Sequence, residues 1–148
     1  MRLWRISNYA DLKGVGGLKT PGRWHNKGIP VVYLSESPAL AMLEVLVHFE
    51  LSPDETPDNY QLLEVEYTND SGIQALSEAG LPKQWYLDDG YTRLAGDEWL
   101  ASMQGVLLKV PSAVVPHSYN YLLNPRHELA KEFEIIKINT HPFDLRLV

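Results

Sequence analysis

The amino-acid sequence predicts an α+β fold formed by one compact domain over residues 1–148. Its 148 residues are 45% apolar and 22% charged, which is ordinary for a single globular domain. An apolar helical pattern covers residues 39–47, and short β-branched or aromatic runs occur on both sides of it. Because helices and strands do not alternate regularly, a doubly wound parallel sheet is not expected.

In the first half of the chain, the expected strands are residues 3–6 and 31–35. The second of these is the run Val-Val-Tyr-Leu-Ser, which is bounded by prolines. A helix is expected to follow over residues 39–47, because Ser37 is a good N-cap and Pro38 suits the first helical position.

The second half of the chain predicts more strands than helices. The expected strands are residues 60–67, 106–110 and 133–138, and the expected helix is residues 92–103. Residues 112–115 are expected to extend or pair with the strand at 106–110. The other segments are expected to be a surface connection at 48–59, an irregular stretch at 81–90, a loop at 116–125, a helical turn at 128–131 and an extended tail at 143–148.

Composition narrows the possible functions. The chain has no cysteine, which excludes disulfides and thiolate chemistry, and its five histidines lack the close spacing of a metal site. A net charge of −6 without a basic cluster argues against nucleic acid as the direct ligand, but not against a small anion held by a few arginines. The glycines at 14–17 do not complete a dinucleotide-binding motif. The N-terminal segment is too short and polar for a signal peptide, and no apolar run reaches the ~20 residues of a membrane helix. A cytoplasmic location is therefore expected.

Glu44 is the only polar residue in the apolar segment 39–47. A helix that is apolar on all sides is normally buried, and a carboxylate is rarely buried without a partner. Glu44 is therefore expected either at the edge of a cleft or in an ion pair, for which Arg23 and His48 are the candidate cations. Both interpretations fit the helix pattern.

Residues 22–28 read as a loop bounded by glycines, and this loop places Arg23 beside Trp24. An arginine guanidinium binds phosphates or carboxylates, and a tryptophan can stack on a ligand. A solvated arginine and a tryptophan that covers the core are the structural alternatives.

Tyr33 shares a strand face with Ser35, which favours a face that meets solvent or a ligand. A core tyrosine with a satisfied hydroxyl fits equally well. Arg5, in the first expected strand, is a second candidate for binding an anion, and a salt bridge is its structural alternative.

Several ordered motifs resemble those of the RES family, which is named for its arginine, glutamate and serine. The resemblance runs from Arg5 to about His127, with one departure: many members carry Asn directly after the Trp, where this chain has His25 before Asn26. The matching motifs are Gly-Arg-Trp-x-x-x-Gly at 22–28, Val-Val-Tyr-x-x-Glu-Ser at 31–37, Ala-x-x-Glu-x-Leu-Val-His at 41–48, Val-Pro-Ser-Ala-Val-Val-Pro at 110–116 and Asn-Tyr-Leu-Leu-Asn-Pro at 120–125.

The resemblance implies the fold of the ADP-ribosyltransferases, with two small mixed or antiparallel sheets and flanking helices around an NAD cleft. It also implies a toxin of a bacterial type II toxin–antitoxin pair, which depletes cellular NAD by cleaving the nicotinamide–ribose bond with water or phosphate as the acceptor. Such a glycohydrolase or phosphorylase uses NAD as its substrate and needs no metal or other cofactor. The implied protein partner is a helix-turn-helix antitoxin, bound to a toxin homodimer.

The resemblance further implies that Arg23, Tyr33 and Glu44 are catalytic. Cleavage leaves an oxocarbenium-like ribose, whose positive charge Glu44 would stabilise. Tyr33 would stack on nicotinamide or hold the ribose, and Arg23 would bind the pyrophosphate or order the cleft. Weaker candidates for substrate binding are Arg5, Trp24, Ser112 and Asn120.

Two other functions fit the same resemblance. One is an ADP-ribosyltransferase that modifies a protein target, and the other is a non-catalytic binding module on the same fold. The joint presence of Arg23, Tyr33 and Glu44 argues against the binding module, whereas free NAD cleavage and protein modification both remain open.

Overall fold

The computed structural model describes residues 1–49 and 52–148, which form a single domain with one seven-stranded sheet. The α-helices are α1 (Val15–Lys19), α2 (Pro38–Phe49) and α3 (Asp89–Ser102). The 3-10 helices are η1 (Glu78–Gly80), η2 (Trp85–Leu87), η3 (Glu128–Glu132) and η4 (Leu145–Leu147). The strands are β1 (Arg2–Ile6), β2 (Val32–Ser35), β3 (Asn59–Glu66), β4 (Ile73–Ala75), β5 (Leu107–Pro111), β6 (Tyr119–Leu123) and β7 (Glu134–Pro142).

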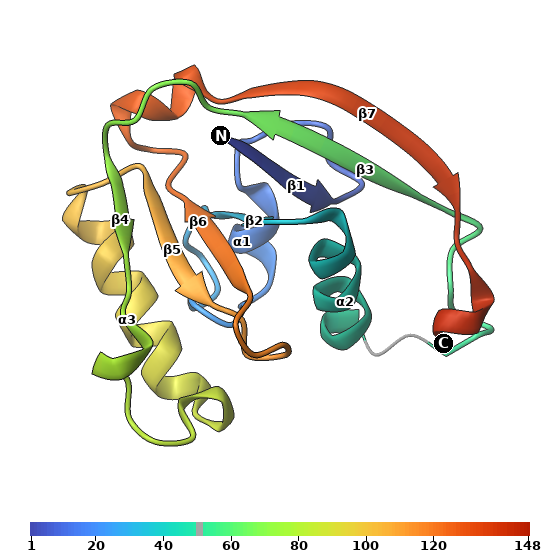
Figure 1. Ribbon diagram of the computed structural model, residues 1–148, viewed down its shortest axis with the longest axis horizontal. Helices are drawn as coiled ribbons and strands as arrows, with labels where there is room; N and C mark the ends of the chain where they lie inside the picture. Colours follow the sequence, from blue (N-terminus) through green and yellow to red (C-terminus); the bar gives the residue numbers. More distant parts are fainter. Residues whose placement is uncertain (50–51) are drawn as a thin grey trace.

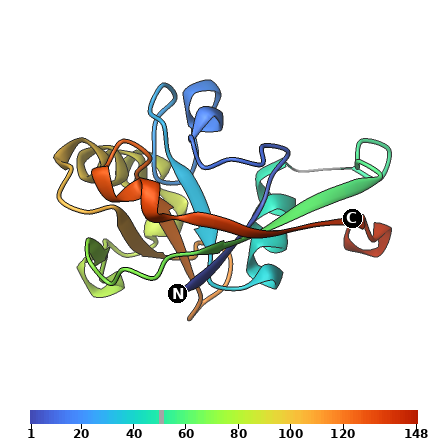
Figure 2. The ribbon, with the colours of Figure 1, turned by 90° about the horizontal axis from the view of Figure 1, so that it is seen from above.

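The sheet is mixed, with the strand order β4-β5-β6-β2-β1-β3-β7. Neighbouring strands run antiparallel except β4 and β5, which are parallel. Figure 1 shows that α3 lies beside β4 and β5, while α2 lies below β2 and β1. The long pair β3–β7 extends away from the rest of the sheet in both views (Figures 1 and 2).

The hydrophobic core forms two clusters, one on each face of the sheet, because alternate residues of a strand point to opposite faces. Along β2, Val32 and Leu34 belong to one cluster and Tyr33 packs against the other. The first cluster comprises Leu3, Val32, Leu34, Val65, Tyr67, Val106, Leu107, Tyr121, Leu123 and Phe133. The second comprises Trp24, Val31, Trp85, Leu100, Leu108, Val110 and Leu122.

The start of α2 is as predicted. The Leu40 N–H donates to Ser37 Oγ at 3.1 Å, which is the expected N-cap bond, and Pro38 occupies the first helical position. The helix is not buried on all sides, however, because Val47 is 54% exposed and Leu40 and Ala41 carry the buried face. Glu44 lies between these two faces.

The expected pair of small sheets is wrong, because the described strands form one sheet. The physical reason is β6. This segment was expected to be a loop, since it lies between two prolines and contains Asn120, but it pairs with both β5 and β2 and joins them. Residues 112–115 form a bend instead of a strand.

Smaller differences concern the connections. α1 and β4 were not expected, and residues 145–147 form η4 within the predicted extended tail. The predicted surface connection at 48–59 begins with residues that continue α2, and residues 50–51 within it lie outside the described part of the chain.

Candidate functional site

A cavity of about 610 Å³ is lined by residues of α1, α2, β1, β2, β3 and β6, and its volume is in the range typical of small-molecule sites. Among the described residues, its lining contains three cationic side chains, Arg5, Lys19 and Arg23, and one carboxylate, Glu44. This balance is opposite to that of the whole chain, whose net charge is −6. The cavity therefore suits an anionic ligand, one part of which would contact the Glu44 carboxylate.

Side chains of three neighbouring strands line the cavity in one row. Asn120 of β6 pairs with Ser35 of β2, and Ser35 pairs with Trp4 of β1. Residues directly opposite each other in antiparallel strands share a face of the sheet, so all three face the cavity. One face of α2 completes this part of the cavity, with Ala41, Glu44, Val45 and His48.

Glu44 is held through one of its two carboxylate oxygens. Its Oε1 accepts hydrogen bonds from Ser112 Oγ at 2.7 Å and from Asn120 Nδ2 at 2.8 Å. Within residues 1–49 and 52–148, no hydrogen bond to Oε2 is found. Both partners are neutral, and Arg23 pairs with Asp89 instead. Among the described residues the Glu44 carboxylate therefore has no paired cation, and its Oε2 is available to a ligand.

Ser35 and Ser112 orient the groups around Glu44. Ser35 Oγ donates to Asn120 Oδ1 at 2.7 Å, so the Asn120 amide turns its NH2 group toward Glu44. Ser112 Oγ accepts two backbone N–H groups of the following loop, each at 3.1 Å, and donates its own hydrogen to Glu44. Ser112 is not among the described residues that line the cavity, so it reaches a ligand only through Glu44.

The Arg23 side chain is fixed to the start of α3. Its Nη1 donates to the Tyr86 carbonyl at 3.0 Å and to Asp89 Oδ1 at 2.5 Å, and its side chain is 33% exposed. Arg23 and Glu44 nevertheless line the same cavity.

The backbone of residues 22–24 is docked on α3 as well. Thr92 Oγ1 donates to the Arg23 carbonyl at 2.6 Å, and Arg93 Nε donates to the Gly22 carbonyl at 2.8 Å. A Cβ at Gly96 would lie 1.6 Å from the carbonyl oxygen of Trp24, so only glycine allows this approach. The loop that carries Arg23 is therefore part of a rigid contact with α3.

Tyr33 lines the cavity with its hydroxyl already engaged. His25 Nε2 lies 3.0 Å from the Thr20 carbonyl, which can only accept, so Nε2 carries the hydrogen and Nδ1 accepts from the Tyr33 hydroxyl at 2.6 Å. The hydroxyl also accepts the Trp24 N–H at 3.1 Å. Burial lowers the pKa of His25 and raises that of Tyr33, so both groups are neutral at pH 7. This bonding favours a role for the Tyr33 ring over one for its hydroxyl.

Two of the weaker candidates have different surroundings. Arg5 lines the cavity, its Nη1 donates to the Asp11 carbonyl at 3.4 Å, and burial lowers its pKa. Within the described residues Arg5 forms no ion pair, so its guanidinium is available to bind an anionic ligand. Trp24 is only 2% exposed and packs against Trp85 with ring centroids 5.7 Å apart, so it covers the core, as its structural alternative described.

Residues 2–146 match the sequence model of the RES domain. The chain belongs to the RES domain family. This RES domain is 46% identical over 138 residues to "Toxin Res" of Pseudomonas putida, a match that covers 91% of this chain and 92% of that protein. It is 34% identical over 155 residues to the "Prs ADP-ribosylating toxin" of Sphingobium sp., with 98% of this chain and 95% of that protein covered.

A solved structure supports the fold of the RES domain. A chain of the crystal structure of the M. tuberculosis MbcT–MbcA toxin–antitoxin complex superposes with a TM-score of 0.75 at 15% identity, covering 99% of this chain and 85% of that chain. At this identity the likeness concerns the fold alone.

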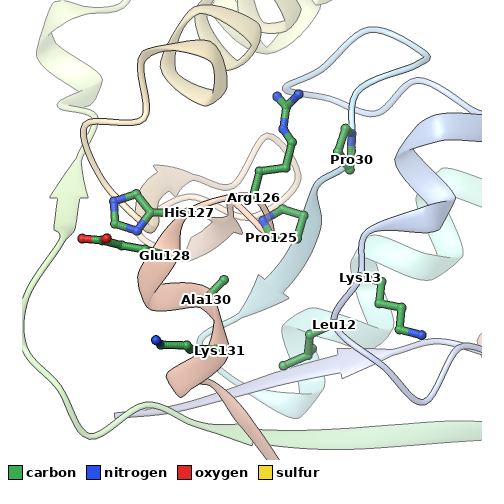
Figure 3. Close-up of a pocket in the computed structure, with 9 residues that line it drawn as sticks. All are labelled: Leu12, Lys13, Pro30, Pro125, Arg126, His127, Glu128, Ala130 and Lys131. Carbon is green, nitrogen blue, oxygen red and sulfur yellow. The ribbon is translucent and has the colours of Figure 1, made fainter.

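A second cavity of the RES domain, of about 420 Å³, lies beside η3 and is lined by three cationic residues, Lys13, Arg126 and Lys131. Figure 3 shows that the charged ends of these side chains do not converge: Arg126 extends past Pro30, and the two lysines point to opposite sides. Of these two cavities in the described part of the chain, the first is the one that combines cations with a carboxylate fixed by hydrogen bonds.

Two kinds of feature are absent from the described residues. No group of three or more His, Cys, Asp or Glu side chains is placed to hold a metal ion. No helix among the described residues is sufficiently long and apolar to cross a membrane.

The sequence analysis did not single out several residues that build the site. Ser35 had a usable signal, since it shares a strand face with Tyr33, but nothing local linked it to Asn120. Asp89 and Thr92 contact residue 23 from α3, and their spacing is that of any helix face. These contacts join segments more than 60 residues apart, which is why no local pattern reveals them.

Proposed function

We propose that this RES domain is an enzyme that cleaves NAD at the nicotinamide–ribose bond. The observation that carries the proposal is Glu44, the single carboxylate of a cavity that otherwise carries cations, held on Oε1 with no hydrogen bond to Oε2 among the described residues. A dinucleotide with a pyrophosphate suits the cations, and a ribose whose positive charge develops during the reaction suits the carboxylate.

In the proposed reaction, the bond between nicotinamide and ribose C1′ breaks, and nicotinamide leaves as a neutral base with the bonding electron pair. Glu44 Oε2 accepts a hydrogen bond from a ribose hydroxyl and stabilises the oxocarbenium-like ribose. An oxygen of water or phosphate then bonds to C1′, and a proton is released. The Tyr33 ring packs against the nicotinamide half, and Arg5 and Arg23 bind the pyrophosphate.

The proposed biological role is that of a toxin in a type II toxin–antitoxin pair, which depletes NAD in the bacterial cytoplasm. Two observations support this role: the similarity to proteins named Toxin Res, and the likeness of the fold to a chain of a toxin–antitoxin complex. The proposed partner is a helix-turn-helix antitoxin that binds a toxin homodimer.

The experiment that tests the enzymatic proposal is product analysis by mass spectrometry after incubation with NAD, in buffers with and without phosphate. We expect nicotinamide with ADP-ribose if water is the acceptor, and nicotinamide with ADP-ribose 1″-phosphate if phosphate is the acceptor. Intact NAD at high enzyme concentration in both buffers, with the antitoxin absent, would contradict the proposal.

A second candidate function is ADP-ribosylation of a protein. The observation that favours it is the similarity, over nearly the whole chain, to a relative named as an ADP-ribosylating toxin. The same incubation distinguishes the two: free cleavage proceeds without any added protein, whereas a strict transferase releases nicotinamide only when its target is present.

A further inference from the structure

The cavity around Glu44 extends to a second end that is built of aromatic and apolar groups. Tyr60 at the start of β3 and Phe143 after β7 line this end, together with Pro57 and with Phe49 at the end of α2. The Tyr60 and Phe143 rings meet edge to face, with centroids 5.8 Å apart at 84°, and the His141 ring lies 5.6 Å from Tyr60. Phe143 is buried and Tyr60 is half-buried, so the pair is a fixed feature of the wall.

The register of the sheet gives the distance between the two ends. Ser35 beside the Glu44 site is opposite Trp4, and Trp4 is opposite Glu64 of β3. Tyr60 precedes Glu64 by four residues and shares its face of the sheet. Two strand spacings of about 4.8 Å and four residues of about 3.4 Å separate Ser35 from Tyr60 by roughly 16 Å. Tyr60 and Phe143 therefore lie at the opposite end of the cavity from Ser35 and Asn120.

A cation also lines this cavity. Arg5 lines the cavity from β1, the strand between β2 and β3, and it forms no ion pair among the described residues. The cavity thus combines a carboxylate with neutral hydrogen-bond partners, a guanidinium and an aromatic wall. A dinucleotide carries the matching groups: a ribose with its leaving base, a pyrophosphate and a second base.

We propose that Tyr60 and Phe143 form the subsite for the adenine base, and that this subsite makes the enzyme prefer dinucleotides over nicotinamide mononucleotide. This inference rests on the proposed NAD cleavage and names which end of the substrate the aromatic residues bind. Purine rings stack well on aromatic side chains, and such contacts are sensitive to loss of the ring.

The test compares nicotinamide release from NAD and from nicotinamide mononucleotide, which lacks the adenylate half. The variants are Tyr60→Leu, which removes the ring, and Tyr60→Phe, which keeps it. We expect Tyr60→Leu to lower kcat/KM for NAD by about 5- to 100-fold, the range found when a stacking side chain is lost. Its kcat/KM for the mononucleotide should stay within about twofold of the wild type, and Tyr60→Phe should resemble the wild type with both substrates.

A binding measurement separates this inference from the proposed reaction. Titration with adenosine monophosphate should show binding to the wild type and to Tyr60→Phe, and weaker binding to Tyr60→Leu. If the wild type releases no nicotinamide from either substrate but shows this Tyr60-dependent binding, the reaction is wrong and the adenine subsite stands. If NAD is cleaved but Tyr60→Leu slows both substrates equally, or adenosine monophosphate binds all three proteins alike, the subsite is wrong.

Thermal melting of each variant shows whether the fold is intact. Should Tyr60→Leu not fold, Phe49→Ala serves in its place, since Phe49 is 60% exposed and its truncation leaves no internal void. The expected result is a smaller loss with NAD and no loss with the mononucleotide. Equal losses with both substrates would overturn the proposal.

Discussion

Glu44 and Arg23 line the same cavity but are held in opposite ways. Glu44 is bonded by neutral side chains, Ser112 and Asn120, which come from the sheet side of the site. Arg23 is bonded by a carboxylate, Asp89, whose side chain is 53% exposed. The Glu44 carboxylate is therefore held in position without a cationic partner, whereas the Arg23 guanidinium is in a solvent-exposed ion pair.

This difference indicates different tasks. A carboxylate that is oriented by neutral donors keeps its full field for a developing positive charge, which is the arrangement that electrostatic catalysis needs. An exposed ion pair contributes little to stability and is readily exchanged for another anion. We therefore expect changes near Glu44 to affect turnover, and changes near Arg23 to affect substrate affinity or the fold of its loop.

Glu44→Gln should give the largest effect. The glutamine can still accept the bonds of Ser112 and Asn120, but the charge is gone, so turnover should fall by roughly 10²–10³. No cation is stranded, because both partners are neutral, and the free energy of unfolding should change by less than about 1 kcal/mol. Nicotinamide release and thermal melting on one preparation measure both quantities.

Glu98→Gln, on the exposed face of α3, is the control for Glu44→Gln. A strongly destabilised Glu44→Gln with normal turnover per folded molecule would remove Glu44 from the chemistry.

Gly96→Ala should be the most damaging change to the Arg23 side of the site. Its Cβ would meet the Trp24 carbonyl oxygen at 1.6 Å, and both groups belong to backbone that cannot easily move. We expect a loss of roughly 3 kcal/mol, at the upper end of overpacking effects. Denaturant unfolding gives this value. Gly80→Ala is the matched control, since nothing lies within 4 Å of its Cβ position. Equal stabilities of the two variants would contradict the docking of residues 22–24 on α3.

Ser35→Ala should have an intermediate effect that appears in turnover. Without the Ser35 hydroxyl, Asn120 is free to rotate its amide and release Glu44, and loss of one such bond corresponds to roughly tenfold. Steady-state kinetics should show a lower kcat with a nearly unchanged KM. In a Glu44→Gln background the same change should cost little, because Ser35 acts through Glu44. Additive losses in the double variant would show that Ser35 acts on the fold and not on the carboxylate.

Asp89→Asn should have the smallest effect on stability and a distinct effect on binding. The pair with Arg23 is exposed, so its loss should change the free energy of unfolding by less than about 1 kcal/mol. With its competitor neutralised, Arg23 should bind the pyrophosphate better, and KM for NAD should fall by a few fold. Glu66→Gln removes the same unit of charge from the ion pair with Arg2, which lies outside the cavity lining of the described residues. A higher KM for Asp89→Asn would mean that Asp89 positions Arg23 for the substrate.

The sequence predicted the local features of this molecule well. The Ser37 cap, Pro38 at the first helical position and the strand that carries Tyr33 all depend on neighbouring residues, and the structure confirms them. The segment around Asn120 was misread as a loop, because an asparagine in a central strand is stable only with partners. Those partners are Ser35 and Glu44, which lie 85 and 76 residues away along the chain.

The same distinction applies to the candidate site. The sequence identified Glu44 as a carboxylate that needs a partner, but the only candidate partners it suggested were charged. Neutral partners such as Ser112 and Asn120 cannot be predicted from the pattern of the helix that carries Glu44. It also offered Trp24 as a stacking surface, and the structure places that ring against Trp85. Tertiary packing decides whether such a residue is exposed or buried. The local sequence pattern does not contain that information.

The most direct test of the central claim is the amount of nicotinamide released from NAD by the purified wild-type protein with no other protein present. We predict many turnovers per enzyme molecule in phosphate buffer, with the release abolished or reduced by at least about 10²-fold in Glu44→Gln measured side by side. Release that stays below one nicotinamide per enzyme molecule, or that is equal for the two proteins, would contradict the account.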